Sequence, residues 1–220
     1  MVELGGRPLI AHTFATAQAC TGIDRTFLST DIPEALALAQ RSYPKIEVPF
    51  VRPPELCRDE TSQVEVVDHL LEHLENSERL VPDAIVLLQP TSPFRRIGEM
   101  AAALRTFHET GCQSLLGVAK VLHHPADYLY RKADAEAPFE WVMRAPEWRR
   151  RQDFPEVYFN TGALYICTTR YFLHHRQFYD QDSRLFVMAE ESALDIDTPF
   201  DFQLAQGWWT GSSSEDYSAG

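Results

Sequence analysis

The chain has 220 residues, of which 45% are hydrophobic, so it is long enough to bury the core of one globular domain. Its 20 basic and 32 acidic residues give a formal net charge of -12, which argues against a general nucleic-acid-binding protein. The four cysteines occur singly, without the spacing of a zinc site or a disulfide framework, and we therefore expect a cytoplasmic protein. Apolar runs such as residues 84–88 are far too short to span a membrane.

Helical and extended patterns alternate through the first half of the chain. In order, they predict a helix over residues 8–20, a strand over 25–29, a helix from Pro33, a strand over 46–51, a helix from Ser62, a strand over 84–88, a helix over 97–110 and a strand over 114–121. This alternation is typical of βαβ units, so we predict a Rossmann-like α/β fold with a mainly parallel sheet flanked by helices. Ligands bind beyond the carboxyl ends of strands in such sheets, which directs attention to residues 89–95.

The second half of the chain is less regular. Residues 123–159 mix charged, aromatic and proline residues over a length that exceeds an ordinary loop, and we predict a small excursion that contributes to dimerisation or to a sugar site. A mobile surface loop is the alternative. The pattern then predicts a strand over 162–167 and helices over 171–179 and 199–206. We therefore expect one domain over residues 1–209 and a disordered tail over 210–220.

The clearest candidates for chemistry are two carboxylates, Asp195 and Asp197. They lie two positions apart, so in an extended segment both side chains point to the same face, where they repel each other unless a cation lies between them. Mg²⁺ suits such a pair because it is held by a few carboxylates together with phosphate oxygens and water. The alternative is that Asp197 or Thr198 caps a helix that begins at Pro199. For Asp197 both roles stay open, whereas Asp195 favours the metal.

A second group of polar residues follows the predicted strand over 84–88. Gln89 carries an amide that can both donate to and accept from a ligand, and Arg95 or Arg96 could supply positive charge. A polar turn stiffened by Pro90 and Pro93 is the plainer interpretation.

Two further sets of residues are weaker candidates. Arg52 ends a predicted strand and could meet a phosphate or a base edge, while Thr61 or Ser62 could cap the next helix. Residues 149–151 form a run of three arginines that could meet an anionic group, or could simply be solvated.

Taken in chain order, the motifs GGRPLI, STD, RPPEL, DETS, LLQPTSPFR, HHP, NTGALYI and DIDTPFDFQLA resemble the acylneuraminate cytidylyltransferase family, the CMP-sialic acid synthetases. The resemblance runs from Leu4 to about Gln206, and LLQPTSP and DIDTP are its most specific parts. It implies a Rossmann-like domain with a smaller dimerisation excursion, hence a homodimer. It also implies a reaction in which the anomeric hydroxyl of a sialic-acid-like nonulosonic acid attacks the α-phosphate of CTP and releases pyrophosphate. Neutralisation of phosphate charge would dominate such a reaction.

The resemblance also implies roles for particular residues. The matching positions are Asp195 and Asp197 as catalytic ligands of Mg²⁺, Arg52 and Ser62 at the nucleotide, and Gln89, Asn160 and Arg151 at the sugar. The neighbouring Gln63 is the alternative to Ser62. Within the same chemistry, legionaminic acid or 3-deoxy-manno-octulosonic acid could be the sugar, and a non-catalytic homologue that binds CTP is a further alternative.

The sequence departs from the family pattern at two places. Family members have Asn-Gly before the strand that matches ALYIC, whereas here Thr161 separates Asn160 from Gly162. The family also opens with a strand and a basic, Gly-rich phosphate loop of the type ARGGSKxxxxKN, and the sequence begins at Met1 just after it. An internal methionine mistaken for a start codon would produce this pattern. We therefore expect the 220 residues to be weakly active or inactive, because such a segment supplies a central strand and the phosphate cradle.

Overall fold

A computed structural model describes residues 1–121, 130–131, 140–141 and 154–211. The helices, including two short 3₁₀ turns, are α1 (Leu9–Ala19), α2 (Pro33–Ser42), η1 (Pro54–Leu56), α3 (Gln63–Glu78), α4 (Ile97–Thr110), α6 (Thr169–His175), η3 (Glu191–Ala193) and α7 (Pro199–Gly211). The strands are β1 (Glu3–Leu4), β2 (Arg7–Pro8), β3 (Thr26–Phe27), β4 (Ile46–Glu47), β5 (Ala84–Leu87), β6 (Ser114–Lys120), β7 (Tyr130–Arg131), β8 (Glu140–Trp141), β9 (Tyr158–Thr168) and β10 (Arg184–Val187).

The largest sheet has four strands in the order β10-β6-β9-β5. β10 runs parallel to β6, and β9 runs antiparallel to both β6 and β5. Three of the four strands therefore share one direction, and the sheet is mixed because the longest strand, β9, lies between two of them in the opposite direction. β3 and β4 form a separate parallel pair. Among the described residues, β5 pairs with β9 alone, so its second edge carries no strand.

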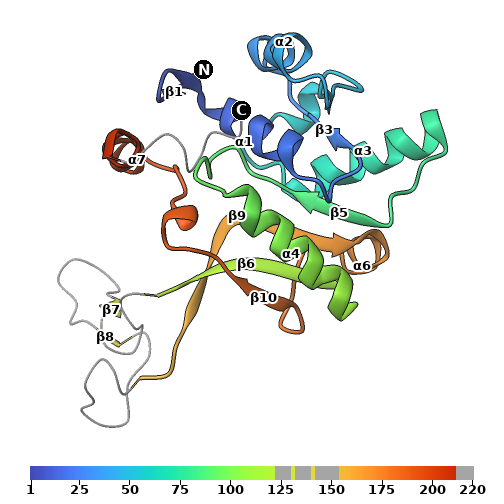
Figure 1. Ribbon diagram of the computed structural model, residues 1–220. Coiled ribbons are helices and arrows are strands. Elements are labelled where there is room, and N and C mark those ends of the chain that lie inside the picture. Colours follow the sequence, from blue (N-terminus) through green and yellow to red (C-terminus); the bar gives the residue numbers. More distant parts are fainter. Residues whose placement is uncertain (122–129, 132–139, 142–153, 212–220) are drawn as a thin grey trace.

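Helices cover both faces of this sheet, and alternate residues of β9 show how. Ile166 lies in a buried cluster with Ala103 of α4, whereas Cys167, its neighbour, lies in a cluster with Val67 of α3. Successive residues of a strand point to opposite faces, so α4 packs on one face and α3 on the other. Figure 1 shows α4 crossing the sheet and α1, α2 and α3 gathered beyond β5. This three-layer arrangement is the α/β architecture predicted from the sequence.

A second core lies under α1 and α2. Phe14 and Ala17 of α1, Leu28, Ala39 of α2 and Ile46 form one buried cluster. The C-terminal helix α7 is attached separately, through Ala205, which packs with Leu4 and Phe94. These contacts place α7 beside β1 at one side of the molecule, as Figure 1 shows.

Several sequence predictions are confirmed and others are corrected in detail. The helix α4 has the predicted bounds, while β3 and β4 are shorter than predicted and β9 begins at Tyr158, before the predicted start. The strand β10 was not predicted at all. Of the predicted excursion, the described part contains the antiparallel pair β7 and β8. Most of the predicted tail, residues 212–220, lies outside the described residues, and residues 210 and 211 belong to α7. No described helix is long and apolar enough to cross a membrane.

Candidate functional site

Three segments that are distant in the sequence meet beyond the carboxyl end of β5. Gly162, within β9, has a φ of +72°, and a Cβ atom built there would lie 2.9 Å from Asp195 Oδ2 and 2.9 Å from Gln89 Oε1. The carboxylate oxygen of Asp195 and the amide oxygen of Gln89 therefore both lie against the backbone of Gly162. Two of the residues predicted from separate motifs are brought together at this point, at the sheet edge where ligands of open α/β sheets bind.

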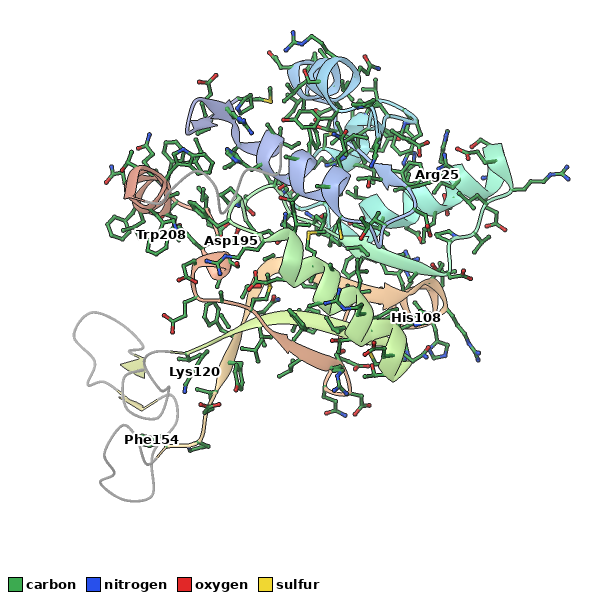
Figure 2. The ribbon with its side chains drawn as sticks, viewed as in Figure 1. Arg25, His108, Lys120, Phe154, Asp195 and Trp208 are labelled. Atoms are coloured by element: carbon green, nitrogen blue, oxygen red, sulfur yellow. The ribbon has the colours of Figure 1, made fainter. Side chains whose placement is uncertain are left out.

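Asp195 is anchored by the segment that follows β5. Ser92 is fully buried, and its hydroxyl donates a hydrogen bond of 3.3 Å to Asp195 Oδ1. The next amide, of Ile196, donates to the carbonyl of Thr91 at 2.9 Å. Figure 2 shows Asp195 between the sheet and α7, on the segment that leads into that helix. The proline-rich turn after β5 thus fixes the position of the carboxylate.

The loop before Asp195 is held by a residue of α4. Glu99 accepts a hydrogen bond from the amide of Ala189 at 2.7 Å through Oε1, and one from the hydroxyl of Ser192 at 2.5 Å through Oε2. Ser192 is fully buried. A carboxylate with both oxygens engaged by donors on the same loop restricts that loop, and Asp195 follows it directly.

Arg95 lies beneath the site and is only 2% exposed. Its guanidinium donates to the carbonyls of Ala163 at 2.6 Å and Gln89 at 2.8 Å, and to the hydroxyl of Thr13 at 3.3 Å. Burial lowers the pKa of Arg95 to about 10, and the negative charge of Asp195 acts in the opposite direction. The group is still protonated at neutral pH. It joins α1, the end of β5 and β9 around the site.

The two basic residues of this turn have different partners in the protein. The buried guanidinium of Arg95 donates the three hydrogen bonds within the protein described above. Arg96 lies 3.6 Å from Glu191 in a partly exposed ion pair. Arg95 therefore positions the backbone of Gln89 and of β9.

Asn160 is held by its neighbours at the start of the same bend. Its Oδ1 accepts from the amide of Gly162 at 3.0 Å, and its Nδ2 donates to the hydroxyls of Tyr165 at 3.0 Å and Tyr179 at 3.4 Å. The two tyrosine rings are stacked with centroids 5.8 Å apart. Burial raises the pKa of Tyr165, so its hydroxyl keeps its proton. Sequence analysis missed both tyrosines: Tyr165 lies in the NTGALYI motif, but no local signal singles out Tyr179.

Thr161, which separates Asn160 from Gly162, lies where the pairing of β9 with β6 is irregular. Along β6, Leu116 pairs with Tyr165 and Val118 pairs with Asn160, so the register shifts between these two pairs. A bulge bends a strand and lets a glycine adopt positive φ. The hydroxyl of Thr161 is buried and donates to the carbonyl of Gly117 at 2.9 Å. The departure from the family pattern thus has a defined structural place next to the site.

The hydrogen bonds at the N-terminus of α7 show whether Asp197 or Thr198 caps this helix. Thr198 Oγ1 accepts from the amide of Asp201 at 3.2 Å, and Asp201 Oδ2 accepts from the amide of Thr198 at 2.8 Å. Thr198 is therefore the capping residue, in a reciprocal arrangement like a capping box. The carboxylate of Asp197 is exposed and is not needed for the cap. Of the two roles open for Asp197, capping is excluded.

The other predicted residues lie apart from this cluster or outside the description. Arg52 donates from Nε to the hydroxyl of Ser29 at 3.1 Å, and a second donor of its guanidinium reaches the Ser29 carbonyl. Ser62 is the N-cap of α3, in a capping box with Glu65. Within the described residues, Arg52 and Ser62 thus contact Ser29 and Glu65, not the Asp195 cluster. Arg151 falls in the part of the chain that is not described.

Comparison with known proteins then decides the family. Residues 1–207 match the family model described as cytidylyltransferase. The chain belongs to the cytidylyltransferase family.

Two relatives agree with this membership. The chain is 28% identical over 206 residues to an N-acylneuraminate cytidylyltransferase of Streptococcus agalactiae serotype V, with 92% of this chain and 47% of that one covered. It is also 28% identical over 204 residues to a CMP-N,N'-diacetyllegionaminic acid synthase of Legionella pneumophila, with 92% and 85% covered. The chain thus spans about half the length of the streptococcal relative.

The likeness to solved structures shows the fold. One is a CMP:2-keto-3-deoxy-manno-octonic acid synthetase complexed with CTP, at a TM-score of 0.64 and 16% identity, with 96% of this chain and 90% of that one covered. Another is a 4-diphosphocytidyl-2C-methyl-D-erythritol synthase from Anaerococcus prevotii, at a TM-score of 0.61 and 14% identity, with 94% and 88% covered. The Rossmann-like α/β arrangement of this chain is therefore shared with these two proteins.

The donor set of the site is compatible with Mg²⁺. Among the described residues there is no cluster of three or more His, Cys, Asp or Glu side chains that could hold a metal ion. Asp195 and Asp197 would supply only carboxylate oxygens, which leaves most positions of an octahedral shell to other ligands. Mg²⁺ is commonly held in this way in phosphate-binding sites, by one or two carboxylates with water and substrate phosphates.

Proposed function

We propose that this protein is a nucleotidyltransferase that uses CTP to activate a sialic-acid-like nonulosonic acid, giving a CMP-sugar and pyrophosphate. The observation that carries the proposal is the meeting of Gln89, Gly162 and Asp195 beyond the carboxyl end of β5, in a chain of the cytidylyltransferase family. The names of its relatives support the substrate class, because they include an N-acylneuraminate cytidylyltransferase and a pseudaminic acid cytidylyltransferase.

In this proposal Asp195 and Asp197 hold Mg²⁺, which when bound neutralises charge on the triphosphate. Asp195 is suited to the task because Ser92 fixes one carboxylate oxygen while the other lies toward Gly162. The absence of a side chain at Gly162 lets the oxygens of Asp195 and Gln89 lie close to its backbone. Orientation of the reacting groups, more than covalent catalysis, is what such a site contributes.

The remaining residues are proposed to bind the two substrates. Gln89 presents its side-chain amide to the sugar. The hydrogen bond that Arg95 donates to the backbone carbonyl of Gln89 holds this residue in place. Asn160 and Arg151 also bind the sugar, and Arg52 and Ser62 hold the nucleotide. The hydroxyls of Tyr165 and Tyr179 accept hydrogen bonds from the side-chain amide of Asn160 and set its position.

A homodimer and a cytoplasmic location complete the proposal. The dimer rests on the resemblance stated above and on the aromatic residues of the segment 123–159. All four cysteines, Cys20, Cys57, Cys112 and Cys167, are free, which suits a reducing compartment.

The test is a pyrophosphate-release assay with CTP, Mg²⁺ and a panel of sugar acids that includes N-acetylneuraminic, legionaminic and 3-deoxy-manno-octulosonic acids. We expect weak release with at least one of them, and its loss in Asp195→Asn. No release with any sugar, together with CTP binding in a calorimetric titration, would favour a non-catalytic CTP-binding homologue. If the protein neither releases pyrophosphate with any sugar nor binds CTP, the proposal is refuted.

A further inference from the structure

Two adjacent glycines form the turn between β1 and β2, and they have similar backbones but different surroundings. Gly5 and Gly6 have φ angles of +59° and +74°, and positive φ at both positions is typical of a two-residue hairpin turn. A Cβ atom built on Gly5 would lie 2.0 Å from Nε1 of Trp209, whereas one built on Gly6 would meet nothing within 4 Å. The backbone conformation alone accounts for Gly6. Gly5 is also needed because the indole of Trp209 occupies the place of its side chain.

Trp209 is one of two points at which α7 is held against the rest of the protein. Its ring packs edge-on against His12 with centroids 4.8 Å apart, and its centroid lies 6.3 Å from that of Phe94. The second point is Ala205, which is fully buried in a cluster with Leu4 and Phe94. Ala205 and Trp209 are four positions apart, so they lie on the same side of the helix. Together they set the tilt of α7 against the hairpin and α1.

The position of Asp197 depends on α7 more directly than that of Asp195 does. The carboxylate of Asp195 accepts a hydrogen bond from Ser92, in the turn after β5. By contrast, the backbone amide of Asp197 donates to Oδ2 of Asp201 at 3.2 Å, and the amide of Thr198 donates to the same oxygen at 2.8 Å. Asp201 belongs to the first turn of α7. Asp197 is therefore tied to the beginning of the helix.

We propose that Trp209, packed on Gly5, fixes the tilt of α7 and thereby positions Asp197 for metal binding. Because it concerns Asp197 as a ligand of Mg²⁺, this inference rests on the proposed function. At a helical rise of about 1.5 Å per residue, Trp209 lies about 6 Å from Ala205 on one side and Asp197 about 12 Å on the other. If the helix tilts about Ala205, a displacement at Trp209 is roughly doubled at Asp197. Trp209 is thus a positioning residue that acts from the opposite end of α7.

The experiment compares Gly5→Ala with Gly6→Ala by calorimetric titration with CTP, in the presence and in the absence of saturating Mg²⁺. The ratio of the two affinities measures what the metal ligands contribute. Gly5→Ala is expected to lower the affinity for CTP with Mg²⁺ about tenfold, as for the loss of a group that supports a metal ligand, and to leave the affinity for CTP alone unchanged. Gly6→Ala is the matched control, because its methyl group is placed on the same kind of backbone but contacts nothing. It should keep both wild-type affinities.

Trp209→Leu removes the same contact without a change in the turn. It should reduce the effect of Mg²⁺ to a similar extent, and it is the main test if Gly5→Ala does not fold. In Gly5→Ala/Trp209→Leu the smaller side chain leaves room for the new methyl group, so the double variant should bind no more weakly than Trp209→Leu. Hydrogen exchange reports on the helix itself: the amides of α7 should exchange faster in Gly5→Ala than in Gly6→Ala, and those of α4 equally in both.

The failure of this inference can be told apart from the failure of the proposed function. Wild-type binding of CTP that Mg²⁺ strengthens, and that Gly5→Ala leaves unchanged, would overturn the inference alone. Equal losses in Gly5→Ala and Gly6→Ala would do the same, since they would come from the shared backbone conformation, and so would losses that simply add in the double variant. A wild type that does not bind CTP, or binds it equally well with and without Mg²⁺, would count against both.

Discussion

Gly162 is the residue whose side chain, or lack of one, most directly shapes the candidate site. A methyl group there would lie 2.9 Å from both Asp195 and Gln89, closer than Cβ atoms approach other atoms, and the φ of +72° disfavours any other residue. We predict that Gly162→Ala loses at least about 99% of CTP-dependent activity, because a displacement of an ångström at a site can cost a hundredfold. Steady-state pyrophosphate release measures this.

Gly111→Ala is the control for Gly162→Ala. Gly111 ends α4 with a φ of +62°, and a Cβ atom there would meet nothing within 4 Å. Both variants should lose about 1–2 kcal/mol of unfolding free energy from the left-handed backbone. Only Gly162→Ala should lose activity, and equal activities in the two variants would show that the close approach at Gly162 is unimportant.

Glu99 acts on the site at a distance, through the loop that carries Asp195. Glu99→Gln replaces one acceptor oxygen by an NH₂ group, which must then face either the Ala189 amide or the Ser192 hydroxyl. We predict a loss of about 1–2 kcal/mol in stability, as for a buried donor that loses its partner. If the loop positions a Mg²⁺ ligand, the Mg²⁺ concentration for half-maximal activity should rise as well.

The comparison for Glu99→Gln is Glu191→Gln, on the same loop. Glu191 forms a partly exposed ion pair with Arg96 at 3.6 Å, an interaction expected to contribute little. In Glu191→Gln the Mg²⁺ concentration for half-maximal activity should stay at the wild-type value. A Glu99→Gln variant that is less stable but has an unchanged Mg²⁺ requirement would reduce Glu99 to a purely structural residue.

At the scale of the elements, α3 shows how one residue can have two roles that experiments can separate. Ser62 accepts from the amide of Glu65 at 3.2 Å and the carboxylate of Glu65 accepts from the Ser62 amide at 2.8 Å. Ser62→Ala should cost about 1 kcal/mol, the usual value of a lost N-cap. Ser62→Asp keeps a capping side chain and should retain more stability.

The Asp variant tests the proposed nucleotide contact of Ser62. A new negative charge beside a triphosphate should raise the KM for CTP, whereas a residue that only caps a helix should leave it unchanged. Thermal unfolding and KM are therefore measured on both variants. A wild-type KM in Ser62→Asp would remove Ser62 from the nucleotide site.

The sequence predicted elements well where their signals are local. The bounds of α4 follow from helical periodicity over residues 97–110 and from Gly111, which ends the helix with positive φ. The strand β10 was missed because Arg184–Val187 is only four residues long, and its apolar part, Leu185–Val187, is too short to predict a strand. The direction of β9 between β5 and β6 was not predictable either, since strand order depends on contacts between distant segments.

The same distinction applies to the site. Asp195 and Gln89 were found because each lies in a distinctive motif and at the end of an element. Glu99, Ser92 and Tyr179 were not found, because their roles arise from contacts between segments that are distant in the sequence. The separation is 103 residues for Ser92 and Asp195, 93 for Glu99 and Ser192, and 19 for Tyr179 and Asn160. Arg95 was recognised as a cation, but its burial, which decides its role, is a property of the folded chain.

On the scale of the whole molecule, His12 links the N-terminal strand, α1 and α7, and it makes the stability of that assembly depend on pH. The ring is buried, its Nε2 lies 3.0 Å from the Leu4 carbonyl, and it packs edge-on against Trp209 at 4.8 Å. Burial lowers the pKa of His12 below 6.5, partly opposed by the Leu4 carbonyl, with Arg7 lowering it further. The native state therefore holds the neutral ring while the unfolded chain takes up a proton.

For such a group the stabilising effect is complete above pH 6.5 and is lost as the pH falls below that value toward the lower pKa of the folded state. We predict that the free energy of unfolding declines between pH 7.5 and 5.5, by at most about 1.4 kcal/mol per pH unit from this residue. His12→Gln should flatten the decline, because Gln does not titrate. His108→Gln, at an exposed position on α4, controls for the loss of an imidazole. Urea unfolding at each pH measures the slopes, and equal slopes in His12→Gln and the wild type would mean that His12 does not couple the protein's stability to pH.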